Sequence, residues 1–200
     1  MKIKLLLLVG MGTALGAQAV AAPLVFQAFL DGPSESPPNA SPGTGFTLVT
    51  IDPVAHTMSV SAQFSGLTSG VTAAHIHVIN GPGDANTLDT LGPVATTTPT
   101  FTGFPSGVTS GTYFNTFDMT LATSYRAGWI TDSGGTTAQA ETQLFTGIMS
   151  GRAYFNIHTG QFPGGEIRGF LAPVPEPATM AALGLGVVAL MRRRKSARKA

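Results

Sequence analysis

The chain has 200 residues, no cysteine and a formal net charge of +1. The lack of cysteine excludes disulfide bonds, thiolate metal sites and a cysteine nucleophile. Eight of the eleven Lys and Arg residues lie at the two ends, two before residue 5 and six after residue 191. Between residues 23 and 173, three arginines stand against nine acids, which gives about three minus nine, or −6. This acidic middle argues against nucleic-acid binding, because such binding needs a basic face.

The first residues contain the three parts of a secretory signal peptide. Lys2 and Lys4 precede an apolar stretch over residues 5–15, and small residues follow it as far as Ala22. The apolar stretch is too short to favour a permanent membrane span. We predict a signal peptide over residues 1–21, cleaved after Ala21, so that the secretion machinery is an expected partner.

The segment 22–173 is predicted to be one all-β domain, a Greek-key sandwich or barrel. Its short apolar stretches alternate with Gly, Pro, Thr and Ser, as in such folds. About 150 residues suit one well-buried domain better than two. The predicted strands are 24–30, 44–51, 57–64, 72–79, 112–120, 152–158 and 166–171.

One short helix is predicted within this domain. Thr136 and Gln139 have the spacing of a capping box, apolar side chains follow at helical spacing, and Gly151 can end the helix. Residues 81–100 are poor in apolar side chains and predict a long loop. Trp129 lies in an apolar segment, so we expect it in the core rather than on a sugar-binding surface.

Three of the four histidines lie in two predicted strands. Because side chains alternate along a strand, His75 and His77 share one face, and His158 points away from the apolar residues of its own strand. If the strand order brings these segments together, their polar residues form one face. That face would contain His75, His77, His158, Asn156, Glu166 and Arg168.

Two interpretations of this face stay open. Three imidazoles can bind Cu or Zn, with Glu166 as the carboxylate partner of a ring nitrogen. Alternatively, Asn156, Glu166, Arg168 and the histidines satisfy one another as a polar network without metal. His56 is expected to be a solvated residue of a hairpin turn.

Several segments of this domain resemble the CHRD domain, a module named after chordin that is widespread in exported bacterial proteins. They are Ala-Ala-His-Ile-His over 73–77, Tyr-Phe-Asn-Ile-His-Thr over 154–159 and Phe-Pro-Gly-Gly-Glu-Ile-Arg-Gly-Phe-Leu over 162–171. Phe29, Leu30, Asp31 and Gly32, together with Glu35, fit the start of that module. The resemblance implies an immunoglobulin-like β-barrel and leaves the biochemical activity open.

The end of the chain combines three features in a fixed order. An uncharged apolar stretch over about 178–191 could form a helix of about 21 Å, which is short for a hydrocarbon core of about 30 Å. The cations beyond it would stay in the cytoplasm, as they would for a plain tail anchor. The flanking residues are Val174, Pro175, Glu176 and Pro177 before the stretch, and Arg192, Arg193, Arg194 and Lys195 after it.

This end, residues 174–199, resembles the PEP-CTERM sorting signal of Gram-negative bacteria. That signal is associated with exosortase processing and with extracellular polysaccharide or biofilm production. The resemblance implies a transient inner-membrane anchor, an exosortase-like processing enzyme as partner, and cleavage close to residues 174–177.

No nucleophile elbow, P-loop or dinucleotide-binding motif occurs in the sequence. We therefore expect a non-enzymatic binding or structural module without a cofactor, sorted to the cell surface or exopolysaccharide matrix, with polysaccharide as a candidate partner. The alternative is a histidine-bound Cu or Zn protein. Its role would be a redox one like that of copper/zinc superoxide dismutase, which also has an H-x-H strand on a sandwich.

Overall fold

The computed structural model describes residues 22–84 and 91–175. The predicted signal peptide, apolar span and basic tail lie outside these ranges, as do Glu176 and Pro177. All seven predicted strands are present, together with a short eighth strand. They are β1 (Leu24–Asp31), β2 (Thr44–Asp52), β3 (Thr57–Ser65), β4 (Val71–Val78), β5 (Gly111–Asp118), β6 (Ala153–Thr159), β7 (Ile167–Phe170) and β8 (Ala172–Pro173).

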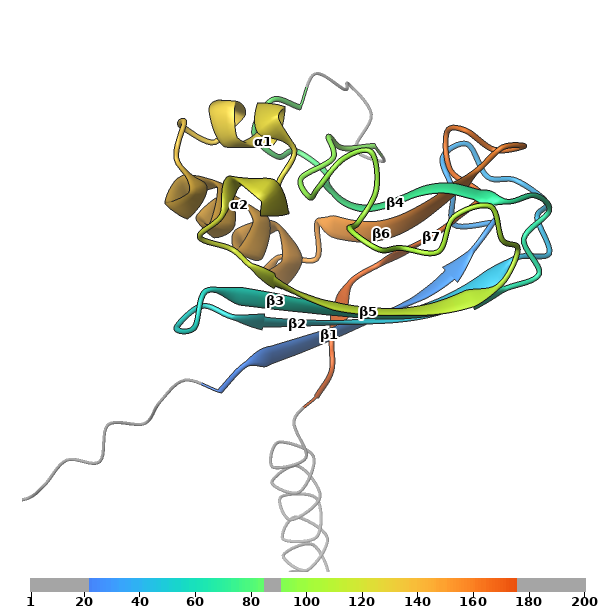
Figure 1. The fold of residues 1–200 in the computed structure, drawn as a ribbon, viewed down its shortest axis with the longest axis horizontal. Helices are drawn as coiled ribbons and strands as arrows, with labels where there is room; N and C mark the ends of the chain where they lie inside the picture. The colour runs from blue at the N-terminus through green and yellow to red at the C-terminus, as the bar shows by residue number, and fades with distance from the viewer. Residues whose placement is uncertain (1–21, 85–90, 176–200) are drawn as a thin grey trace, which may run out of the picture.

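The strands form one antiparallel sheet that is folded into two layers, which confirms the all-β class. The strand order is β4-β6-β7-β1-β2-β3-β5, and β8 pairs with β1. Figure 1 shows β4, β6 and β7 in one layer and β1, β2, β3 and β5 in the other. A single residue pair, Asp31 and Arg168, joins the two layers between β1 and β7.

The core lies between the layers because each strand alternates apolar and polar residues. In β3, Met58 and Val60 are fully buried, whereas Ser59 and Ser61 face the other side. In the opposite layer, Ile76 of β4 and Phe155 of β6 are also fully buried. Apolar burial of this kind contributes roughly 25 cal/mol per Å².

Two helices cover one end of the core (Figure 1). The predicted helix is α2 (Thr137–Met149): the Thr136 hydroxyl accepts a hydrogen bond from Gln139 N, and Gly151 follows with φ +70°. The shorter α1 (Ala127–Asp132) has no side-chain cap and was not predicted. It is held by Trp129, which is fully buried and donates from Nε1 to the Ala140 carbonyl, so the core position of Trp129 is confirmed. Within the described ranges, no helix has the length and apolarity to cross a membrane.

The predicted loop before β5 covers the outer edge of β4. We call residues 91–101 the strap. Its backbone hydrogen bonds to β4 include Ala95 N to Ile76 O at 2.9 Å and Val78 N to Pro93 O at 3.2 Å. The strap therefore provides hydrogen-bond partners for backbone groups at the edge of β4 that would otherwise be unpaired. It also lies beside the histidines of β4.

Candidate metal centre

Three imidazoles converge on the side of β4 and β6 that faces away from the core. In the β4–β6 register, His75 lies opposite Asn156 and His158 lies opposite Ala73. The ring centroids are 5.1 Å apart for His75 and His158, 5.7 Å for His75 and His77, and 6.0 Å for His77 and His158. One ring nitrogen from each histidine lies within 4.8 Å of the other two. The predicted convergence of these three residues therefore occurs.

Each of the three rings uses one nitrogen to contact a backbone carbonyl. Because a carbonyl oxygen only accepts hydrogen bonds, each of these nitrogens carries the ring proton. Two of the carbonyls belong to the strap and one to the loop between β6 and β7. The pairs are His75 Nε2 with Pro99 O at 2.5 Å, His77 Nδ1 with Gly92 O at 2.8 Å and His158 Nδ1 with Pro163 O at 3.0 Å.

The remaining ring nitrogens carry lone pairs that no donor satisfies. They are Nδ1 of His75, Nε2 of His77 and Nε2 of His158, all of them buried. An unsatisfied buried polar atom costs roughly 1–3 kcal/mol. A histidine that donates one N–H to a carbonyl and turns its other nitrogen inward has the geometry of a metal ligand.

Burial also favours the neutral form of these rings. It lowers the pKa of His75 to about 4 and that of His77 to about 3, although the hydrogen bonds to Pro99 and Gly92 act in the opposite direction. Burial likewise lowers the pKa of His158 below its usual value. Neutral imidazole is the form that binds metals. With metal–nitrogen bonds of about 2.1 Å, the nitrogens lie at most about 4 Å apart, so the rings need to close by roughly 1 Å.

The comparisons with known proteins identify the family. The CHRD domain matches residues 26–171. The chain belongs to the CHRD-domain family. The PEP-CTERM protein-sorting motif matches residues 173–195, so this CHRD protein is exported, sorted by exosortase-type machinery and located at the surface or outside of a Gram-negative cell. No curated protein and no solved structure matches the chain.

Within the CHRD domain, Glu166 lies away from the three histidines, contrary to the predicted shared face. Its carboxylate accepts hydrogen bonds from Ser41 Oγ at 2.6 Å, Thr68 N at 2.7 Å and Thr159 Oγ1 at 2.5 Å. Burial alone would raise the pKa of Glu166, but these hydrogen bonds hold it below its usual value. The alternation fails because Glu166 precedes the regular part of β7 and follows Gly165, whose φ is +132°. Glu166 is therefore not the carboxylate partner of a histidine.

The predicted polar network exists around a different acid. Asn156 Nδ2 donates to Glu35 Oε1 at 2.6 Å, and Arg168 Nε lies 3.9 Å from Glu35 Oε2. Burial raises the pKa of Glu35 to about 7, against the opposing effects of Arg168 and Asn156. Asn156 and Arg168 therefore form a network with Glu35, and Glu166 belongs to a separate cluster. The resemblance to the CHRD domain was the only sequence signal that pointed to Glu35.

Two further groups support the histidines of the CHRD domain. Tyr154 stacks on His77, and its hydroxyl accepts a hydrogen bond from Gly92 N at 3.4 Å. A Cβ atom on Gly92 would lie 2.2 Å from Val78 O, so only glycine lets the strap approach β4 this closely. Sequence reasoning could not find the carbonyls of Gly92, Pro99 and Pro163, because backbone carbonyls carry no residue-specific signal.

The fourth histidine does not join the centre. His56 lies in the turn between β2 and β3, as predicted, and its side chain is 52 % exposed. It is nevertheless paired, because Nδ1 lies 2.9 Å from Glu141 Oε2. The CHRD domain therefore offers His56 as a control residue for experiments on the other three.

Proposed function

We propose that this CHRD protein is an exported metal-binding protein in which His75, His77 and His158 hold one Cu or Zn ion. One observation carries the proposal: one ring nitrogen from each of the three histidines lies within 4.8 Å of the other two, and each ring, fixed by a backbone carbonyl, has a buried nitrogen without a partner. A metal-free network would leave all three lone pairs unsatisfied, so the geometry favours the metal-binding interpretation.

The chemistry of the centre follows from its donor set. No fourth His, Cys, Asp or Glu joins the group within residues 22–84 and 91–175. Three protein ligands leave a position for water or another small ligand. His75 is buried, whereas His77 and His158 are half-buried, so the centre lies close to the surface of the domain.

Elemental analysis of the exported, mature protein tests the proposal. After loading with Cu or Zn and removal of excess ion, we expect one ion per wild-type chain and none in His75→Ala combined with His77→Ala. His56→Asn is the matched control, since asparagine tolerates the φ of +54° at this position. A metal content below one ion per chain that is equal in the wild type and the double variant would contradict the proposal.

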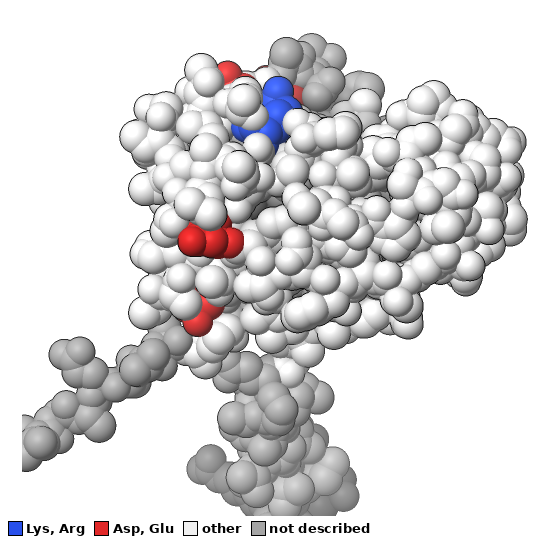
Figure 2. All heavy atoms as spheres, viewed as in Figure 1, with Lys and Arg blue, Asp and Glu red and all other residues white. Residues whose placement is uncertain are grey.

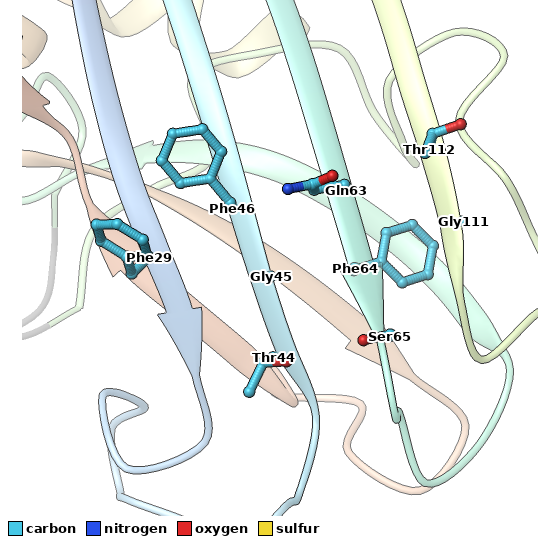
Figure 3. Close-up of a pocket in the computed structure, with 9 residues that line it drawn as sticks. All are labelled: Phe29, Thr44, Gly45, Phe46, Gln63, Phe64, Ser65, Gly111 and Thr112. Carbon is cyan, nitrogen blue, oxygen red and sulfur yellow. The ribbon is translucent and has the colours of Figure 1, made fainter.

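A second function, binding of a neutral extracellular polysaccharide, is supported by the solvent-facing side of the β1–β2–β3–β5 layer. Phe29 is 72 % exposed and Phe114 is 73 % exposed. Phe29 and Phe46 lie side by side with ring centroids 5.1 Å apart. Figure 3 shows these two rings in one row with Gln63 and Thr112, along an open groove. Aromatic rings can stack on sugars while amides and hydroxyls form hydrogen bonds with them.

The charge of this surface suits a neutral polymer better than an anionic one. Between Asp31 at one end of the layer and Asp52 and Asp118 at the other, the solvent-facing residues of these strands are uncharged. In Figure 2, charged atoms gather at the end of the molecule that carries the helices and the β2–β3 turn, and the described surface at the opposite end shows none. With about −6 over residues 23–173, the domain repels anionic chains, which leaves a neutral polysaccharide as the fitting partner.

Co-sedimentation with insoluble cellulose, a neutral polysaccharide, tests this second function. Phe29→Ser combined with Phe114→Ser should weaken binding about tenfold through loss of aromatic contact. Leu121→Ser is the control, because Leu121 is 52 % exposed and lies outside this layer. Equal sedimentation of the double variant and the control would contradict the assignment of this surface.

A further inference from the structure

Within residues 22–84 and 91–175, no carboxylate contacts the ligands of the metal centre proposed above, and from this we infer that the centre binds Cu(I) in preference to Cu(II) and Zn(II). The inference rests on the proposed function and adds to it the charge state of the ion.

The ligands and their immediate partners are all neutral. The three imidazoles donate to the carbonyl oxygens of Gly92, Pro99 and Pro163, and none of them donates to a carboxylate. Glu166, the carboxylate expected to serve here, accepts its hydrogen bonds from Ser41, Thr68 and Thr159. The described residues of the site therefore supply dipoles and lone pairs to an ion but no anion.

A cation, Arg168, lies against the ring of Tyr154, which in turn stacks on the ligand His77. The Arg168 guanidinium carbon lies 4.8 Å from the centroid of the Tyr154 ring, and that ring stacks on His77 with centroids 4.8 Å apart. Glu35 Oε2 lies 3.9 Å from Arg168 Nε, and Glu35 Oε1 accepts a hydrogen bond from Asn156 Nδ2. The acid that balances Arg168 therefore contacts the arginine and not the histidines.

These charges favour an ion of low charge. The free energy needed to transfer an ion from water into a buried site rises with the square of its charge. For a divalent ion it is therefore about four times that for a monovalent ion. Among residues 22–84 and 91–175, no anion contacts the ligands to offset that cost for a divalent ion, which would need an external anion in the open position. Cu(I) is stable with three imidazole ligands and needs no fourth one.

A centre of this kind holds copper in its reduced state. Each tenfold preference for Cu(I) over Cu(II) raises the reduction potential of the bound ion by about 59 mV. Copper held in this way is suited to sequestration at the cell surface, whereas a superoxide-dismutase-like cycle requires both oxidation states to be accessible.

Competition titrations on the exported, mature protein test the inference. Cu(I) is titrated without oxygen against bicinchoninate, and Cu(II) and Zn(II) are titrated against chelators of graded affinity. We expect the dissociation constant of Cu(I) to be lower by about a hundredfold, the effect of roughly one missing charge near the site. Copper loaded as Cu(I) should also remain silent in electron paramagnetic resonance after exposure to air.

A charge placed beside the ligands provides the matched variant. Ala73 lies opposite His158 across the strand pair, two residues before His75 and on the same face. Ala73→Asp should move the preference toward Cu(II) by about tenfold to a hundredfold, whereas the neutral Ala73→Asn should leave it unchanged.

The possible outcomes separate the inference from the function on which it rests. If wild-type protein binds Zn(II) or Cu(II) as tightly as Cu(I), the inference is overturned and the metal centre stands. If Ala73→Asp and Ala73→Asn have the same preference, the charge argument is overturned. If none of the three ions binds, both the metal centre and the inference are overturned.

Discussion

His77 and Tyr154 stack almost face to face, with ring centroids 4.8 Å apart and an angle of 7° between the ring planes. The stack fixes the orientation of an imidazole whose Nε2 has no hydrogen-bond partner. Groups that orient metal ligands typically change metal affinity by about tenfold to a hundredfold when they are removed. The contact between a strand residue and its cross-strand neighbour therefore bears directly on the proposed metal centre.

Replacement of Tyr154 tests this role. Tyr154→Leu should lower metal affinity by about tenfold or more, because His77 can then rotate, whereas Tyr154→Phe keeps the stack and should stay close to wild type. Competition titration with Zn(II) or Cu(I) measures both variants. Wild-type affinity in a folded Tyr154→Leu protein would show that the stack is not needed to position His77.

Glu166→Gln should separate stability from metal binding. The carboxylate accepts three hydrogen bonds in a cluster that excludes the histidines, so its loss should destabilise the fold by about 1–3 kcal/mol. Metal affinity should remain unchanged. Urea unfolding and metal titration on the same preparation provide the two readouts, and a marked loss of affinity in the folded variant would restore Glu166 to the metal centre.

Arg168→Gln should be strongly destabilising above pH 7. Arg168 and Glu35 are both buried, so removal of the cation leaves an uncompensated carboxylate, at a cost of about 3–5 kcal/mol. The cost should shrink near pH 5, where Glu35 is protonated, because its pKa is about 7 in the folded protein. Unfolding curves at the two pH values measure the difference, and an equal cost at both would argue against the Arg168–Glu35 interaction.

The pH dependence of stability should also differ between wild type and Glu35→Gln. Burial raises the pKa of Glu35 from 4.5 to about 7, so between these values the folded state binds more protons than the unfolded state. The wild type should therefore lose stability relative to Glu35→Gln as pH rises through this window, by about 3 kcal/mol in total.

This comparison isolates Glu35, because the histidines titrate in both proteins and cancel in the difference. Urea unfolding of metal-free protein at intervals from pH 4.5 to about 7.5 provides the measurement. A difference between the two proteins that does not change with pH would mean that Glu35 titrates normally in the folded state.

Much of the fold could be predicted, since the evidence for it is local. Alternation places Met58 and Val60 in the core, and capping chemistry starts α2 after Thr136. The short helix α1 escaped prediction because it has no capping residue and depends on the buried Trp129. The strap escaped as well, since its hydrogen bonds to Ile76 and Val78 connect backbone atoms whose pairing depends on the whole fold.

The sequence by itself predicted a signal peptide, and it determined the sorting motif, the acidic domain without lysine or cysteine, and the placement of His75 and His77 on one face. These properties depend on composition and on the two-residue period of a strand. Only the tertiary structure decided that His158 joins them, that carbonyls of the strap and of the β6–β7 loop fix their ring protons, and that Glu166 lies elsewhere while Glu35 pairs with Arg168. Each of these depends on contacts between segments far apart in the chain, and such contacts form only when the two layers of the sheet fold together.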